Sequence, residues 1–299
     1  RPCRAAGYLI LEEGRATLVD TNTAKALPHL LGALEENRLR PESVEWVVVT
    51  HLHLDHAGGT AAVLEACPNA TALVHPRAIR HLADPSRLVQ SAKAVYGEEI
   101  FKQLHGTVTA VPEDRLRAVE DGEKLDFGGR VFTFFHTAGH ARHHICLHDS
   151  GSNSVFTGDA FGVGYPPLQR GAAPTLFCST APTDFEPDEA RKTVVRLLAT
   201  GAERAYLTHF GAMEDLAGAA RSLRWSIDAM EAILKEALLT DLDGAALETF
   251  CRNRVQQAFD ETLNHCGVLR RPADQEWMDA DVALNAQGLL YVLQRLRNR

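Results

Sequence analysis

The sequence has few basic residues, no paired cysteines and no long apolar run, and each shortage removes a class of protein. Lysine and arginine number 31 against 39 acidic residues, a net charge of −8, whereas a nucleic-acid binder normally presents a basic face. The six cysteines form no Cys-x-x-Cys pair, which favours free buried thiols in a reducing compartment, with a Cys251–Cys266 bridge left open. No run approaches the roughly 20 apolar residues of a membrane span. We therefore expect a cytoplasmic protein that binds neither nucleic acid nor membrane.

Two common catalytic motifs are also missing. The chain contains no Gly-x-Ser-x-Gly elbow and no glycine-rich phosphate loop ending in lysine, so neither a serine hydrolase nor a P-loop enzyme is indicated. Its 299 residues, 45% of them hydrophobic, can bury one large domain, alone or with a subdomain. No signal segment opens the chain, and its first residue, Arg1, is not Met, which leaves open whether a leader precedes it.

Three histidines and an aspartate gather within six residues, from His51 to His56, and Gly58-Gly59 closes the run. The apolar run 44–49 before them is typical of a buried strand, so the cluster stands at a strand end. Neutral imidazole and carboxylate are the ligands that zinc and neighbouring transition metals prefer. A single histidine here would be read as a surface residue, but four such groups this close predict a metal site.

The pattern His-x-His-x-Asp-His resembles the signature motif of the metallo-β-lactamase superfamily. This resemblance implies an α/β fold, a four-layer αβ/βα sandwich with a metal site at the joint edge of two sheets. It also implies that the remaining ligands lie far along the chain, each just beyond a strand.

Matching positions occur at all three distant motifs of that family. His140 ends Thr137-Ala138-Gly139-His140, which resembles the family's Thr-Pro-Gly-His with Ala138 in place of proline. Asp159 follows the expected strand 154–157, and His209 follows 204–208. The resemblance therefore implies seven ligands: site one has His51, His53 and His140, site two has Asp55, His56 and His209, and Asp159 bridges them.

Several polar residues near these motifs are expected to support the site or to stand aside. Asp20 ends the second strand of an expected hairpin, where relatives often carry an aspartate that supports the metal loop, although an aspartate simply ending a strand is an equal reading. His75 is predicted to be a structural or surface histidine, with an additional metal ligand as the less favoured reading. The other histidines near His140 are read as bystanders or supporting groups: His136, His143 and His144.

The rest of the chain is predicted to be mixed and then helical. Two strands joined by a turn at Glu13-Gly14 are expected over 7–20, a hairpin over 122–130, further strands at 72–76 and 131–135, and helices at 24–39, 60–67 and 86–104. Periodic apolar positions predict three further helices at 219–238, 244–265 and 279–297. We therefore predict a catalytic domain over 1–215 and a packed C-terminal helical segment over 216–299, which could cover the site, flank it or form a homodimer surface.

The resemblance implies a hydrolase. Two divalent ions, zinc first with iron or manganese as alternatives, would hold a hydroxide that attacks a carbonyl. Asp55 and Asp159 are the predicted catalytic residues, Asp55 orienting the hydroxide and taking its proton. The alternative is a mononuclear-iron sulfur (persulfide) dioxygenase. A phosphodiesterase or nuclease and a non-catalytic metal-binding module are less favoured.

The substrate is expected to be a small molecule with an ester-like bond. The compact Gly58-Gly59 ending of the histidine motif resembles the ending of this motif in lactonases and glyoxalase-II-type thioesterases. Lactonases often carry a tyrosine soon after the bridging aspartate, whereas here Phe161 lies close and Tyr165 further on. The apolar loop 162–167 suggests a fairly hydrophobic acyl or lactone substrate.

Overall fold

The computed structural model describes residues 5–180 and 184–298. These residues form two compact units. The first holds the chain up to His136 together with His143–Gly158, and the second holds Thr137–Arg142 together with the described residues from Asp159 onward. We describe each unit by itself.

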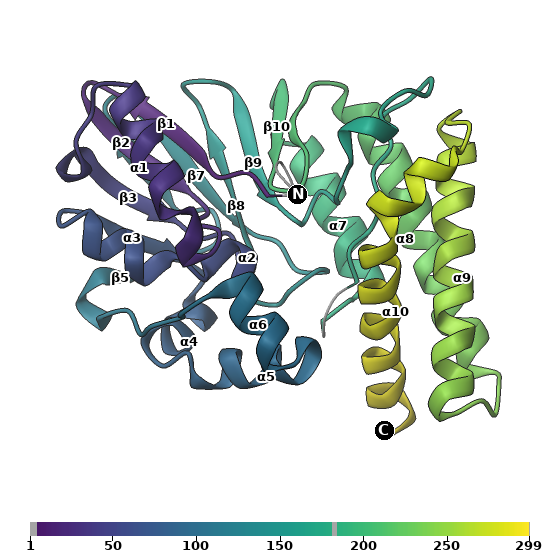
Figure 1. Cartoon of the computed structure of the whole chain (residues 1–299). Helices are drawn as coiled ribbons and strands as arrows, with labels where there is room; N and C mark the ends of the chain where they lie inside the picture. Colours follow the sequence, from purple (N-terminus) through teal and green to yellow (C-terminus); the bar gives the residue numbers. More distant parts are fainter. Residues whose placement is uncertain (1–4, 181–183, 299) are drawn as a thin grey trace. The chain divides into compact units, whose positions relative to one another are not determined.

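A five-stranded sheet in the first unit leads the chain to the histidine motif. Strands β1 (Tyr8–Glu12) and β2 (Arg15–Val19) form the predicted antiparallel hairpin, and β3 (Val44–Val48), β4 (Thr71–Val74) and β5 (Leu116–Ala118) follow in parallel. The turn uses Glu13 at φ 48° and Gly14 at φ 77°, the left-handed pair that tight hairpins favour. Strands β2 and β3 run parallel, so they end at the same edge of the sheet (Figure 1). Asp20 and Thr50 follow these strand ends and are hydrogen-bonded to each other.

Two predicted helices cover this sheet. Helices α1 (Leu27–Glu36) and α3 (Thr60–Ala66) contribute Leu34, Val63 and Leu64 to a core shared with Val47 of β3. Burying each such side chain stabilises the unit by about 1.5–3 kcal/mol. The histidine motif therefore stands between a largely buried strand and a packed helix.

Four further strands of this unit belong to the second sheet: β6 (Lys124–Phe127), β7 (Arg130–His136), β8 (Ile145–Asp149) and β9 (Ser154–Gly158), each antiparallel to the next. The rings of Tyr8 on β1 and Phe156 on β9 meet edge to face at 5.4 Å. The two sheets thus pack together within this unit. Strand β9 ends directly before Asp159, as predicted.

The remaining helices of this unit are α2 (Leu54–Ala57), α4 (Ile79–Ala83), α5 (Ser86–Tyr96) and α6 (Glu98–His105). The helix predicted over 86–104 is interrupted, because Gly97 has φ 78° and both ends one helix and begins the next. Short 3-10 turns lie at Ala24–Ala26, Pro41–Ser43, Pro76–Ala78 and Glu113–Arg115.

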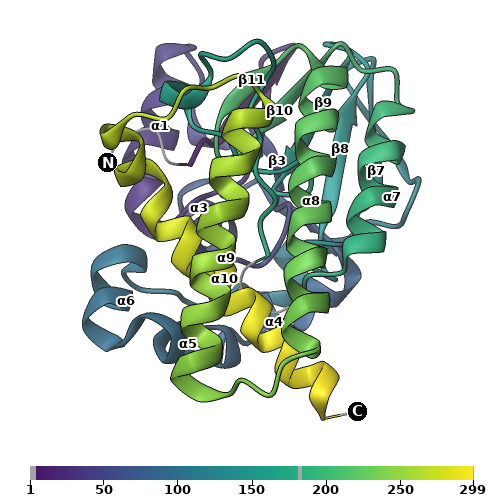
Figure 2. The ribbon, with the colours of Figure 1, turned by 90° about the vertical axis from the view of Figure 1, so that its right-hand side faces the viewer.

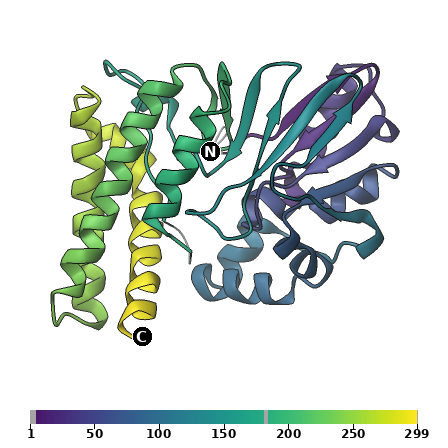
Figure 3. The same cartoon turned by 180° about the vertical axis from the view of Figure 1, so that it is seen from behind.

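The second unit contains α7 (Pro187–Leu198), the hairpin of β10 (Arg204–Leu207) and β11 (Gly211–Met213), and three long helices, α8 (Leu216–Leu238), α9 (Gly244–His265) and α10 (Gln275–Arg297). Two 3-10 turns, Pro166–Leu168 and Pro272–Asp274, complete it. The long helices run side by side (Figures 1 and 3), and α7 lies against α8 (Figure 2). The three predicted C-terminal helices are confirmed, and Leu216 begins α8. The domain boundary after residue 215 stays a prediction.

Two expectations from composition can be compared with the structure. Within the described part of the chain, no helix is both long and apolar enough to cross a membrane. The five described cysteines are free and buried, including Cys251 and Cys266, so the bridge left open between those two is not formed. Cys3 lies outside the described residues.

Candidate metal centre

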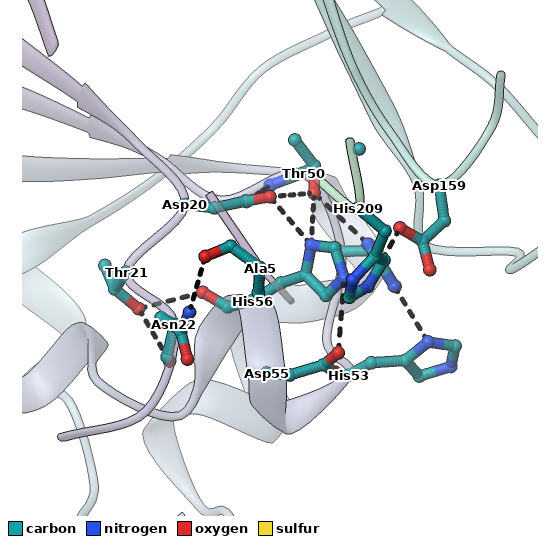
Figure 4. Close-up of polar contacts among 12 residues, drawn as sticks. Ala5, Asp20, Thr21, Asn22, Thr50, His53, Asp55, His56, Asp159 and His209 are labelled. Carbon is teal, nitrogen blue, oxygen red and sulfur yellow. Dashed lines mark hydrogen bonds and ion pairs between the residues drawn. The ribbon is translucent and has the colours of Figure 1, made fainter. Parts of the chain in front are cut away.

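In the first unit, Asp20 is the centre of the contacts that hold the histidine motif. It is 1% exposed and adopts φ 58°, a left-handed conformation that aspartate tolerates better than most residues. Its Oδ1 accepts the Thr50 backbone N–H at 2.8 Å, and its Oδ2 accepts the Thr50 hydroxyl at 2.9 Å and His56 Nδ1–H at 2.7 Å (Figure 4). The expected supporting position of Asp20 is therefore occupied by a carboxylate with three donors.

These contacts fix the tautomers of two histidines. A carboxylate accepts, so the Nδ1 of His56 carries the proton and its Nε2 keeps a lone pair for a metal. The Thr50 hydroxyl donates to Asp20 and therefore accepts from His51 Nδ1, 3.1 Å away. His51 and His56 are thus both prepared to bind through Nε2. Thr50 was not singled out from the sequence, although it stands in the motif directly before His51.

The two glycines that close the motif are required by close backbone approach. A Cβ at Gly58 would lie 2.4 Å from the Leu54 carbonyl oxygen, and one at Gly59 would lie 2.8 Å from the Thr21 carbonyl oxygen. The loop after β2 therefore packs directly on the motif, where the Thr21 N–H and hydroxyl both donate to the His56 carbonyl, at 2.8 and 2.9 Å. Only glycine fits this contact.

The other motif residues lie beside these two. His53 is the residue before α2, and its Nδ1 lies 2.8 Å from His51 Nε2. Asp55, in the first turn of α2, places Oδ2 3.8 Å from His56 Nε2, with its side chain 42% exposed. The four predicted ligands of this unit therefore form two adjacent pairs, His51 with His53 and Asp55 with His56.

In the second unit, the three remaining predicted ligands meet at one carboxylate. His140 Nε2 lies 3.6 Å from Oδ2 of Asp159. His209 Nε2 lies 3.5 Å from Oδ1 of the same carboxylate (Figure 4). The carboxylate is 7% exposed. Each oxygen of Asp159 thus faces a different histidine, the arrangement expected of a carboxylate that bridges two ions.

Helix α7 positions His140. Gly139, at φ 120°, passes so close that a Cβ would lie 2.4 Å from the Ala190 nitrogen. Its carbonyl accepts the Glu186 N–H at 2.9 Å, and the Ala138 carbonyl accepts the Thr193 hydroxyl at 2.7 Å. His140 Nδ1 donates to the Ser179 carbonyl at 3.1 Å, which leaves the Nε2 lone pair for a metal. Sequence reasoning missed this contact, because Ser179 lies 39 residues away in no motif.

The donor distances can be compared with what one ion requires. Two ligand atoms about 2.1 Å from a tetrahedral ion lie about 3.4 Å apart. The 3.5 and 3.6 Å separations at Asp159 match this value, and the 3.8 Å between Asp55 and His56 is slightly longer. His51 and His53 stand at hydrogen-bond distance, so they would separate to hold an ion. The residues present therefore fit divalent metal.

The other histidines have structural contacts. His75 Nδ1 accepts the Arg77 N–H at 3.0 Å and caps a 3-10 turn, as a structural reading predicts. His136 Nε2 lies 2.8 Å from the Val119 carbonyl, and His143 Nδ1 accepts the Leu52 N–H at 3.3 Å. His144 stacks on His51 at 4.8 Å. His143 and His144 therefore support the histidine motif through Leu52 and His51.

A protein-family model described as the metallo-beta-lactamase superfamily matches residues 1–209. The chain belongs to this superfamily. Among its relatives is the metallo-beta-lactamase fold-containing protein ST1585 of Sulfurisphaera tokodaii, 31% identical over 40% of this chain and 46% of the relative. The crystal structure of ST1585 from Sulfolobus tokodaii is similar with a TM-score of 0.59 and 22% identity, covering 88% of this chain and 94% of that one.

Two further relatives have enzymatic names. The hydroxyacylglutathione hydrolase of Klebsiella pneumoniae is 27% identical over 60% of this chain and 57% of its own length. The human acyl-coenzyme A thioesterase MBLAC2 is 28% identical over 52% of this chain and 58% of its own length. The matches to these three curated relatives thus span about half of each relative's length. The predicted α/β class, with two sheets flanked by helices and a helical C-terminal extension, is confirmed for this superfamily member.

Proposed function

We propose that this superfamily member is a metal-dependent hydrolase that cleaves an ester-like bond, with a thioester as the first candidate. Two divalent ions, zinc first, are the proposed cofactors. His51, His53 and His140 would hold one ion, and Asp55, His56 and His209 the other, with Asp159 bridging. The substrate is a small molecule. The free buried thiols support the proposed reducing, cytoplasmic compartment.

The observation that carries this proposal is the Asp159 carboxylate with one histidine Nε2 at each oxygen. These two separations are longer than the 2.7–2.9 Å of the hydrogen bonds that Asp20 accepts. Separations near 3.5 Å suit atoms that share an ion. The fixed Nδ1 protons of His51, His56 and His140 support the same reading.

The chemistry divides between the ions and the chain. When bound, two divalent ions supply a water activated near neutral pH and polarise the carbonyl under attack. Asp55 combines a place beside His56 with a half-exposed carboxylate, so it can orient the water and pass its proton to solvent. Asp159 presents one carboxylate oxygen to each of its two histidines.

One observation favours an acyl substrate. Two of the relatives are named for the hydrolysis of acyl groups carried on glutathione or coenzyme A. The small hollow beside His140 and Asp159 in the second unit does not add to it, because the apolar side chains that line it, Phe185, Leu223 and Ile227, are at most 2% exposed and belong to the packed core.

The apolar loop after Asp159 is weak evidence for an apolar substrate. Val163, Tyr165 and Leu168 are buried, and the Tyr165 hydroxyl donates to the Asp281 carboxylate of α10. Packing against the C-terminal helices therefore explains the apolar character of the loop. Because the Tyr165 hydroxyl bonds α10, Tyr165 does not supply the tyrosine that lactonases often carry soon after the bridging aspartate.

A proton-release assay on the purified protein tests the proposal. Glutathione and coenzyme A thioesters, lactones, β-lactams and phosphodiesters are compared, together with metal analysis. We expect thioester turnover with two ions per chain, and a loss of about 100-fold or more in Asp159→Asn. The matched control is Asp149→Asn, because Asp149 is also a buried aspartate at a strand end but binds Ser152 and Gly151.

The competing functions give different results. A single iron per chain with oxygen uptake on a persulfide would establish the sulfur dioxygenase instead. Turnover only of phosphodiesters would indicate a nuclease or phosphodiesterase. Tightly bound metal without turnover of any substrate would favour the non-catalytic module. Full thioester activity in Asp159→Asn would contradict the ligand assignment.

A further inference from the structure

An extended segment in the second unit, 176–180, links the C-terminal helices to His140. On one edge it pairs with Val163, whose N–H donates to the Phe177 carbonyl at 2.9 Å and whose carbonyl accepts the Phe177 N–H at 2.8 Å. Two residues on, the Ser179 carbonyl accepts His140 Nδ1–H at 3.1 Å. Because alternate residues of a strand present their polar groups to the same edge, Phe177 and Ser179 both face this side.

The opposite edge is bound by side chains of α8 and α10 where another strand would normally pair. The Leu176 N–H donates to Ser222 Oγ at 3.2 Å, and the Cys178 N–H donates to Ser226 Oγ at 2.9 Å. The Thr180 N–H donates to Asn285 Oδ1 at 2.7 Å. All three alternate N–H groups therefore have a helix side chain as acceptor.

The spacing of the two serines matches the spacing of the segment. Residues i and i+4 of a helix, such as Ser222 and Ser226, lie about 6 Å apart along its axis. Residues i and i+2 of a strand, such as Leu176 and Cys178, lie about 6.7 Å apart. Helix α8 therefore runs alongside the segment in register with its N–H groups.

Burial shows that these polar residues are placed for this contact. Ser222, Ser226 and Asn285 are each at most 2% exposed, on faces otherwise lined by residues such as Ile227 and Leu289. A buried hydroxyl or amide destabilises a helix packing face unless it is hydrogen-bonded. Here the acceptors satisfy backbone donors that apolar residues would leave unpaired.

We propose that the C-terminal helices are a positioning device for the metal ligand His140, acting through Ser226, Asn285 and the Ser179 carbonyl. Ser226 and Asn285 bond the residues on either side of Ser179, and so fix the direction of its carbonyl. That carbonyl holds the His140 imidazole with its proton on Nδ1 and its lone pair on Nε2. This inference rests on the proposed metal-dependent function, in which the C-terminal helices would orient one metal ligand.

The test uses the whole chain with the variants Ser226→Ala and Asn285→Ala. In metal-free protein, long-range proton–nitrogen NMR reports the tautomer of His140, assigned with His140→Gln. Cobalt(II) titration against a chelator then measures the two binding constants. We expect a mixed His140 tautomer in both variants and 10- to 100-fold weaker binding of one cobalt ion, with the other unchanged.

Two controls separate positioning from general loss of stability. Ser226→Thr keeps the hydroxyl acceptor and should restore the wild-type tautomer and affinity. Thr262→Val removes a buried hydroxyl of α9 that donates to the Ala258 carbonyl of the same helix, and should change neither. Wild-type tautomer and cobalt affinity in folded Ser226→Ala and Asn285→Ala would overturn the inference. Failure of the wild type to bind cobalt would instead refute the proposed function, and the His140 resonances would still decide whether the helices fix the imidazole.

Discussion

Replacing Asp20 with asparagine should weaken metal binding at His56 without leaving a cavity in the core. Asparagine keeps the shape of the residue and one oxygen, which can still accept the Thr50 N–H. Its amide nitrogen is a donor, however, and it would face His56 Nδ1–H, which now lies 2.7 Å from a carboxylate oxygen. His56 must then lose this hydrogen bond or move its proton to Nε2, the atom that faces Asp55.

The size of the effect follows from the contacts. Asp20 accepts three hydrogen bonds while 1% exposed, and two of them are lost or inverted in Asp20→Asn. Each bond to a buried charge contributes about 1.5–3 kcal/mol, and removal of the buried charge offsets part of the loss. We expect about 3 kcal/mol lower stability without metal, and a 10- to 100-fold weaker constant for the ion held by His56, about 1.4–2.7 kcal/mol.

Zinc or cobalt competition titration measures the affinity, and urea denaturation of the metal-free protein measures the stability. Asp149→Asn is again the matched control, because it removes the charge of an equally buried aspartate bonded to Gly151, Ser152 and Arg130. It should lower the stability and leave both binding constants unchanged. If Asp20→Asn bound both ions within twofold of the wild type, the tautomer argument would be wrong.

Two further predictions concern the glycine contact and a buried histidine. Gly59→Ala places a Cβ 2.8 Å from the Thr21 carbonyl oxygen and should destabilise the protein by about 1–3 kcal/mol. Gly32→Ala is the control, because it has open space at a helical position, and it should stabilise the protein by about 0.5–1 kcal/mol. Equal effects of the two substitutions in thermal unfolding would contradict the close-contact argument. Burial, and then the charges of His136 and Arg77, lower the pKa of His75 from 6.5 to about 4. The unfolded chain thus binds this proton more readily, so stability is lost as the pH falls from about 6.5 toward 4, by roughly 2 kcal/mol between pH 7 and 5. The His75→Asn variant can still cap the turn, and between pH 7 and 5 its unfolding free energy in urea should fall by roughly 2 kcal/mol less than that of the wild type. If both proteins lost the same unfolding free energy between these pH values, His75 would not titrate in this way.

The sequence by itself determined the elements and the candidate ligands. Apolar periodicity located β3 and the helices α8, α9 and α10, because local patterning sets which face of an element is buried. The candidate ligands, among them His51, Asp159 and His209, were implied by the family resemblance of motifs that follow β3, β9 and β10. Strand β8 and helix α7 were not predicted, although α7 carries local helix signals, with Pro187 at its start, Asp188 and Glu189 in its first turn and Arg196 in its last.

Tertiary structure alone decided which groups orient the ligands. Asp20 and His56 are 36 residues apart, and Ser179 and His140 are 39 apart; no local pattern records a hydrogen bond between such residues. Packing also decided that the apolar loop after Asp159 contacts α10 and that two serines of α8 bond the segment 176–180. A sequence pattern states which residue types recur, while the direction of a lone pair depends on atoms that only folding brings together.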